Sequence, residues 1–266
     1  MPAWICETCG VQHADSDEPP AGCAICLDER QYIRPDGQRW TTLGELRAER
    51  RAEIRDDGGL LGIGCEPSFA IGQRALLVDS VLWNCTPLLD GMEEVVAERR
   101  GLRAIAIDHP HFYSTAVEWS RAFGGVPVYI HADDRQWLMR PDSCYELWEG
   151  EQLDLGGGLT LLRLGGHFPG AQVLHWAEGN ALLAGDAVAV VSDRRYVSFM
   201  YSYPNLIPLP ASTIRRIVEK LEPWEFDRIY GGWWGQIVES DGKNAVRRSA
   251  ARYICAASTV RGPRSR

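Results

Sequence analysis

A short apolar segment that ends in two closely spaced histidines constrains this chain more than any other feature. The residues from Ala104 to Ile107 form an apolar run, which predicts a buried strand. The run ends at Asp108, and His109 and His111 follow it. Side chains two positions apart in an extended segment point to the same side, so we expect both imidazoles together. The pattern predicts a functional loop at a strand end, where binding and catalytic groups are often presented.

A helix is expected directly after this loop. Thr115 and Glu118 have the T-x-x-E spacing of a capping box, and apolar residues recur behind them at helical intervals. An H-x-H pair is by itself a weak metal signal, and the alternative is two loop histidines without a ligand role.

Four of the eight cysteines are grouped in two C-x2-C turns, Cys6/Cys9 and Cys23/Cys26. Such turns together supply four thiolates to one tetrahedral metal site, and a segment this short needs bound metal in order to fold. Two disulfides are the alternative, which a reducing compartment disfavours. The segment resembles a rubredoxin-like zinc ribbon. Four thiolates suit zinc or iron, and the short loop between the turns favours a structural zinc ion.

Composition limits the class of protein. The chain has 266 residues, enough for one large domain with a small addition. Its net charge of −8 argues against a nucleic-acid partner. No apolar run is long enough for a membrane span, and no secretory signal is expected. With the other cysteines interpreted as reduced thiols, we expect a cytoplasmic protein that binds a small-molecule substrate or ligand. The oligomeric state stays open.

Three units are predicted along the chain: the ribbon at 1–40, a connector helix within 41–58 and a large domain at 59–266. The connector helix is predicted from Thr42 to Ile54, because its charged and apolar residues alternate at helical spacing. The large domain alternates short apolar strands with turns and helices. Predicted strands lie at 60–63, 69–71, 75–78, 126–130, 159–164, 172–176, 181–184 and 226–230, and further helices near 92–96, 214–221 and 243–254.

Two further loops carry metal-binding side chains at strand ends. His167 lies in Gly165-Gly-His-Phe-Pro-Gly170, and Asp186 ends Ala184-Gly-Asp. Histidine nitrogen and carboxylate oxygen both suit zinc or iron. Each loop alone has a structural explanation, with His167 as a turn residue and Asp186 as a cap. The three loops in this order, each after a strand, predict one shared metal site.

Residues 60–240 resemble the metallo-β-lactamase superfamily. The matching segments are Leu77–Asp79, His109–His111, Gly166–Gly170 and Leu183–Asp186, and the region from 161 to 187 is similar to glyoxalase II and related hydrolases. The resemblance implies an α/β fold, an αββα sandwich of two mixed sheets with helices outside. It also implies that His109, His111 and His167 hold one metal, with Asp186 bridging toward a second.

The sequence departs from the family at the second metal. The family motif H-x-H-x-D-H has an aspartate and a histidine where this chain has Tyr113 and Ser114. The last loop has Trp233 and Trp234 and no histidine. We therefore predict one metal ion at the histidine site, zinc or iron, and expect the tryptophans to close the vacated space.

The ligand set predicts a mononuclear hydrolase. Three imidazoles hold one zinc and leave a position for water, as in carbonic anhydrase, and a metal-bound hydroxide would attack a small ester, thioester or lactone. Asp186 is expected to be a fourth donor or to orient the water. Asp108 is expected to fix a histidine tautomer, and Tyr113 to donate to a developing oxyanion.

Two alternatives remain open from the sequence. One is a non-catalytic binding or regulatory protein on the same fold, and the other is a redox protein with iron at both sites. The aromatic segment from Tyr196 to Pro204 is expected either to cover the site or to pack as a surface loop.

Overall fold

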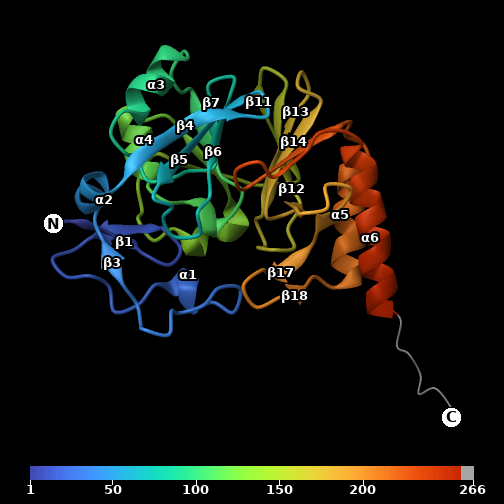
Figure 1. Ribbon diagram of the computed structural model, residues 1–266, viewed down its shortest axis with the longest axis horizontal. Helices are drawn as coiled ribbons and strands as arrows, with labels where there is room; N and C mark the ends of the chain where they lie inside the picture. The colour runs from blue at the N-terminus through green and yellow to red at the C-terminus, as the bar shows by residue number, and fades with distance from the viewer. Residues whose placement is uncertain (259–266) are drawn as a thin grey trace, which may run out of the picture.

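Two sheets packed face to face, with helices on both outer sides, make up most of the molecule (Figure 1). The computed structural model describes residues 1–258. The first sheet has seven strands in the order β10-β9-β8-β7-β6-β5-β4, antiparallel from β4 to β7 and parallel from β7 to β10. Its strands are β4 (Arg51–Asp57), β5 (Leu60–Glu66), β6 (Ala75–Val78), β7 (Val81–Trp83), β8 (Ala104–Ala106), β9 (Val128–His131) and β10 (Tyr145–Trp148).

The second sheet has six strands in the order β11-β12-β13-β14-β19-β20, and only β14 and β19 are parallel. Its strands are β11 (Gln152–Gly156), β12 (Leu159–Arg163), β13 (Gln172–Trp176), β14 (Ala181–Gly185), β19 (Arg228–Gly231) and β20 (Ile237–Val238). Two small hairpins follow β14: β15 (Ala189–Val190) with β16 (Val197–Ser198), and β17 (Met200–Ser202) with β18 (Ile207–Pro208).

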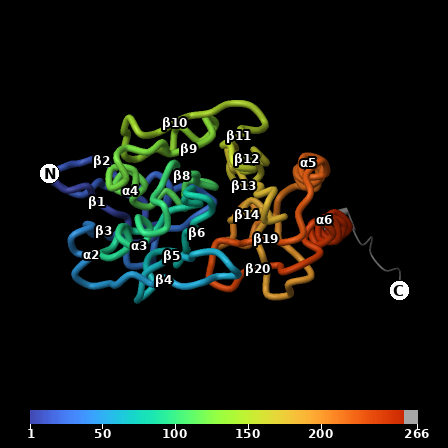
Figure 2. Tube along the Cα trace, turned by 90° about the horizontal axis from the view of Figure 1, so that it is seen from above, coloured from blue at the N-terminus to red at the C-terminus, as the bar shows by residue number. Residues whose placement is uncertain are grey.

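Three buried layers follow from the alternation of side chains along the strands. Between the sheets, Leu76 and Trp83 of the first sheet lie in one cluster with Leu161 and Leu183 of the second. The outer face of the first sheet packs against α3 (Met92–Glu98) and α4 (Ala116–Ala122). The outer face of the second packs against α5 (Ala211–Leu221) and α6 (Gly242–Ser258), as Figure 2 shows from above. The predicted αββα sandwich is confirmed.

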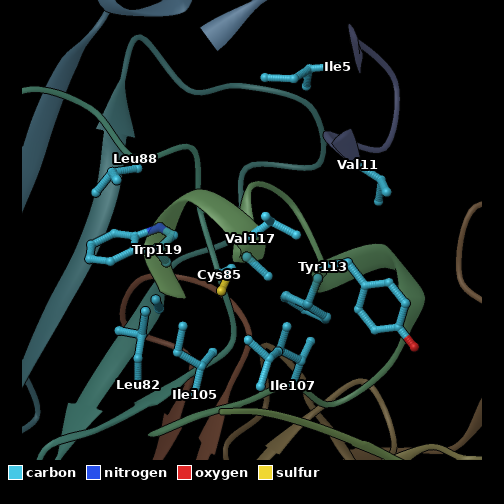
Figure 3. Close-up of a cluster of buried hydrophobic side chains, with 14 of the residues drawn as sticks. Ile5, Val11, Leu82, Cys85, Leu88, Ile105, Ile107, Tyr113, Val117 and Trp119 are labelled. Atoms are coloured by element: carbon cyan, nitrogen blue, oxygen red, sulfur yellow. The ribbon is translucent and has the colours of Figure 1, made fainter. Parts of the chain in front are cut away.

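The N-terminal segment, here called the four-cysteine module (residues 1–41), is joined to the first sheet's outer side. It contains β1 (Ala3–Cys6), β2 (Gln12–Asp15) and β3 (Trp40–Thr41) in one sheet, and a single helical turn, α1 (Ala24–Leu27). Ile5 and Val11 belong to the same buried cluster as Tyr113 and Trp119 (Figure 3). The backbone amide of Gln12 also donates to the carbonyl of Ser114. The module therefore packs directly on the loop that follows β8.

The predicted connector helix is only half correct. Helix α2 (Leu43–Glu49) begins at the capping box of Thr42 and Glu45, but it ends at Arg50, whose backbone is extended. The residues after it form β4, the edge strand of the first sheet, which pairs with β5 over its whole length. Residues 41–58 are therefore no separate connector, because sheet pairing outweighs the helical propensity of this charged segment.

Two other local predictions are wrong. The segment 69–71 is a turn, in which the amide of Gly72 donates to the carbonyl of Phe69. Thr115 does not cap α4, because its hydroxyl accepts from the amide of Leu88 and donates to the carbonyl of Thr86. No helix within residues 1–258 is long and apolar enough to span a membrane.

Candidate metal centre

The three loops at strand ends meet at one point. The side chains of His109, His111, His167 and Asp186 each offer a donor atom, and these atoms all lie within 4.8 Å of one another. All four residues are at most 4% exposed. Residues 110–112 form a 3-10 turn, so His109 and His111 do not alternate along an extended strand as expected. Their ring centroids are nevertheless 4.9 Å apart.

The donor atoms have no partner within the protein. The Nε2 atoms of all three histidines and Oδ1 of Asp186 are buried and make no hydrogen bond. Buried polar atoms are nearly always satisfied, and leaving one unpaired costs about 1–3 kcal/mol. Unpaired polar atoms on four side chains whose donor atoms converge are explained by a cation between these side chains. Three imidazole nitrogens and one carboxylate oxygen are a donor set that fits zinc or iron.

In His109 and His167 the opposite ring nitrogen, Nδ1, has a partner in the protein. His109 Nδ1 lies 2.9 Å from Asp108 Oδ2, and His167 Nδ1 lies 3.1 Å from the carbonyl oxygen of Met200. A carbonyl oxygen only accepts, so His167 carries its proton on Nδ1 and presents a lone pair on Nε2. Carboxylate and carbonyl partners of this kind orient metal-binding histidines. The predicted contact of Asp108 with a histidine is present; its effect on the tautomer stays a prediction.

Asp108 also connects two of the loops. Its Oδ2 accepts the backbone amide of Asp186 at 2.7 Å, and its own amide donates to Asn84 Oδ1 at 2.8 Å. Gly185 makes this approach possible: a Cβ there would lie 1.9 Å from Asp108 Oδ2, and its φ is +50°. Steric contact thus explains why glycine precedes Asp186, because any side chain at position 185 would displace Asp108.

Burial shifts the pKa values at the centre in the directions that favour neutral groups. Burial lowers the pKa of His109, His111 and His167 well below the usual value, so the imidazoles are neutral, as metal ligation requires. Burial, and secondarily the charge of Asp108, raises the pKa of Asp186. Two buried carboxyl groups side by side call for a nearby positive charge, which a bound cation would supply.

The four cysteines form a second candidate site. Cys6, Cys9, Cys23 and Cys26 are all buried and within 4.8 Å of one another through their sulfur atoms. Cys6 Sγ lies 3.5 Å from Cys26 Sγ, and Cys9 Sγ lies 3.7 Å from Cys23 Sγ. A tetrahedron with metal–sulfur bonds of about 2.3 Å has edges of about 3.8 Å, so the spacing suits one metal ion. Gln38 Nε2 donates to Cys6 Sγ at 3.1 Å.

Tyr113 and Ser114 occupy the two positions at which the resemblance implies ligands of a second metal. Tyr113 and Ser114 are buried, and their hydroxyls make no hydrogen bond. Within residues 1–258 no other histidine, cysteine or acidic donor joins the group at His109. Trp233 packs on Phe112 with ring centroids 5.8 Å apart. Trp234 lies instead against the backbone of β5, where it would clash with a Cβ at Gly62.

The aromatic segment from Tyr196 to Pro204 lies against two residues of the candidate centre, His167 and Asp186. The Tyr203 ring lies 5.5 Å from the His167 ring, and its hydroxyl donates to the carbonyl of Asp186 at 3.1 Å. Arg30 of the four-cysteine module lies beside this segment, its guanidinium carbon 5.0 Å from the Tyr201 ring centre. Sequence reasoning missed Arg30, because a single loop arginine carries no local signal.

Asp134 is a second residue that the sequence did not reveal. It lies in the 3-10 turn Ala132–Trp137 and is buried. Its Oδ1 accepts the amide of Gly170, three residues after His167, at 2.9 Å. Burial raises the pKa of Asp134 to about 7, opposed by the Gly170 amide and by Arg30. Asp134 thus supports the His167 loop from the opposite sheet.

Comparison with known proteins identifies chains of similar fold. No family model matches the sequence. Similar solved structures include the metallo-β-lactamase FIM-1 from Pseudomonas aeruginosa in its mono-zinc form, at 14% identity and a TM-score of 0.55, covering 76% of this chain and 96% of that one. A metallo-β-lactamase from Hirschia baltica has 18% identity and a TM-score of 0.54, covering 76% and 97%. The metal-soaked flavodiiron core of Flv1 from Synechocystis sp. PCC6803 has 13% identity and a TM-score of 0.54, covering 77% and 61%.

At these identities the solved structures establish the fold alone. In sequence, the uncharacterized protein YmaE of Bacillus subtilis (strain 168) is 49% identical over 266 residues, covering 96% of this chain and 96% of that protein. The chain therefore has the metallo-β-lactamase fold and belongs to the same protein family as YmaE of Bacillus subtilis.

Proposed function

We propose that this protein is a mononuclear metal-dependent hydrolase of a small ester, thioester or lactone. The observation that carries the proposal is the convergence of donor atoms from three histidines and Asp186, with all three histidine Nε2 atoms buried and without a hydrogen-bond partner. One zinc or iron ion held by these atoms would lower the pKa of a bound water to about 7. The cysteine cluster offers four buried sulfur donors, which would fill a tetrahedral coordination shell, so it would hold a structural zinc ion.

The chain's own residues have distinct roles in this proposal. Asp108 accepts from His109 Nδ1 and fixes the ring so that Nε2 points to the ion. Asp186 supplies the one anionic donor and is held by its backbone amide. Burial raises the pKa of Tyr113 well above its usual value, so its hydroxyl stays protonated and is a hydrogen-bond donor near the centre. A donor of this kind stabilises negative charge that develops on a carbonyl oxygen.

A matched pair of histidine variants tests the proposal. His167→Ala should abolish hydrolysis of aryl esters, thioesters and lactones and remove one metal per chain, measured by elemental analysis. His175→Gln is the control, because His175 is also buried but its Nε2 binds the carbonyl of Glu225, away from the centre. Metal retained without turnover in the wild type would favour a binding role; metal and activity both retained in His167→Ala would refute the site.

We also propose that the protein acts in the cytoplasm. Cys65, Cys85 and Cys144 are buried free thiols, as expected in a reducing compartment.

A further inference from the structure

Arg30 is an unusual residue for its surroundings. Its side chain is 13% exposed, and its Nε and Nη1 atoms are buried without a hydrogen bond. Its guanidinium carbon lies 4.3 Å from the centre of the Phe168 ring, and Phe168 directly follows His167. Asp28 is the acidic partner, at 3.3 Å from Nε, without hydrogen-bond geometry. A largely buried guanidinium with two unpaired N–H donor atoms carries a free-energy cost in the free protein.

Contacts of the neighbouring backbone hold Arg30 in this position. Arg30 follows the ligand-bearing turn of Cys26 by four residues, and its backbone carbonyl accepts from Ser202 Oγ at 3.0 Å. The neighbouring carbonyls of Glu29 and Gln31 accept from Asn205 Nδ2 at 3.0 and 3.1 Å. The segment that carries Arg30 is therefore fixed to the β17–β18 hairpin, whose Met200 carbonyl contacts His167.

Arg30 and His167 border the same pocket, which has a volume of about 530 Å³. Four basic side chains line it, and Glu151 is the one acidic residue among the lining groups. Glu151 is already paired with Lys220 and lies 3.3 Å from Arg163. The basic lining residues are Arg30, Arg163, Arg216 and Lys220. Arg216 is exposed and has no ion pair among the described residues. The lining of the pocket next to the candidate metal centre therefore has more basic than acidic groups, and Arg163 is also paired with Asp133.

We infer that Arg30, supplied by the four-cysteine module, is the specificity-determining residue that binds the anionic group of the substrate. The role of Arg30 in substrate binding rests on the proposed function. The presence of an anion-binding site at Arg30 does not. The planar guanidinium suits a carboxylate or a phosphate, which it binds through two parallel hydrogen bonds. With such a group at Arg30, the rest of a small molecule in the pocket lies toward His167. The expected substrate is an ester, thioester or lactone that carries a carboxylate or phosphate.

Binding without turnover is the first test. Succinate and inorganic phosphate are titrated separately into the metal-loaded protein by calorimetry, which also distinguishes the two kinds of anion. Arg30→Met keeps the length of the side chain and removes the charge, and it should weaken binding of the preferred anion about ten- to hundredfold. Arg215→Met is the matched control: it removes an exposed charge on the same helix as Arg216 but outside the pocket lining, and should stay within about twofold.

A kinetic comparison separates this inference from the hydrolase proposal. The ratio of kcat/KM for an aryl hemisuccinate to that for the neutral aryl acetate should fall about tenfold or more in Arg30→Met, chiefly through KM, and recover in part in Arg30→Lys. If no ester is hydrolysed but Arg30→Met still loses anion binding, the anion site stands and the hydrolase proposal fails. Anion binding that is absent in the wild type, or equal in Arg30→Met, overturns the inference; equal binding would mean coordination to the metal alone.

Discussion

Replacing Asp108 by asparagine isolates the contribution of one carboxylate to metal binding. Asp108 Oδ2 accepts two hydrogen bonds, from His109 Nδ1 at 2.9 Å and from the Asp186 amide at 2.7 Å. An asparagine oxygen in that position still accepts both, but the negative charge that strengthens His109 as a ligand is lost. The amide NH2 would replace Oδ1, which is buried without a partner, so two donor hydrogens would be left unsatisfied.

The expected effect is a ten- to hundredfold loss of metal affinity at the histidine centre, about 1.4–2.7 kcal/mol. Zinc-loaded protein is equilibrated with a series of free-zinc concentrations set by a chelator, and bound metal per chain is measured. The wild type should bind two ions, one at each donor group. In Asp108→Asn the four-cysteine site should be unchanged, which makes it an internal reference. An unchanged metal affinity at the histidine centre would refute the argument that the Asp108 carboxylate orients His109 and strengthens it as a ligand. A third ion in the wild type would refute the mononuclear centre.

Three further predictions follow from single residues. Cys23→Ser should release one metal ion and raise the protease sensitivity of the first forty or so residues, while the histidine centre keeps its ion. Elemental analysis measures the bound metal, and limited proteolysis measures the protease sensitivity. Two retained ions would contradict a metal site at the four cysteines. Asp134→Asn should change the pH dependence of stability. Burial raises the pKa of Asp134 to about 7, so this carboxyl contributes stability below about pH 4 that is lost as the pH rises to about 7. Urea unfolding should therefore show the stability of the variant rising relative to that of the wild type between about pH 4 and about pH 7, by at most about 4 kcal/mol; a difference that does not change with pH would contradict this. Gly185→Ala should lower both Tm and metal affinity, because its Cβ would lie 1.9 Å from Asp108 Oδ2. Gly59→Ala is the control, since Gly59 has a φ of +90° and a Cβ there would meet no atom within 4 Å. Equal losses in both variants would mean that only the strain of a positive φ, about 1–2 kcal/mol, is at work.

Local patterns in the sequence determined the chemistry of both candidate sites. The C-x2-C spacing brings each pair of thiols together within one turn, so the cysteine group required little knowledge of the fold. The loop of His109 and His111 follows β8 of the first sheet. The loops of His167 and Asp186 follow β12 and β14 of the second sheet, and the three loops meet in space. Strands such as β13 and β14 were predicted within a residue of their bounds, because their apolar runs and the turn between them are local signals.

Only the tertiary structure decided the features that depend on residues far apart in the chain. The segment after Arg50 has good helix formers but becomes the strand β4, because β5 offers an edge to pair with. Thr115 has the spacing of a cap, yet its hydroxyl binds Thr86 and Leu88 from another loop. Arg30 and Asp134 have no local pattern at all. Their positions follow from the packing of the four-cysteine module and the first sheet around the His167 loop, a set of long-range contacts that no sequence window contains.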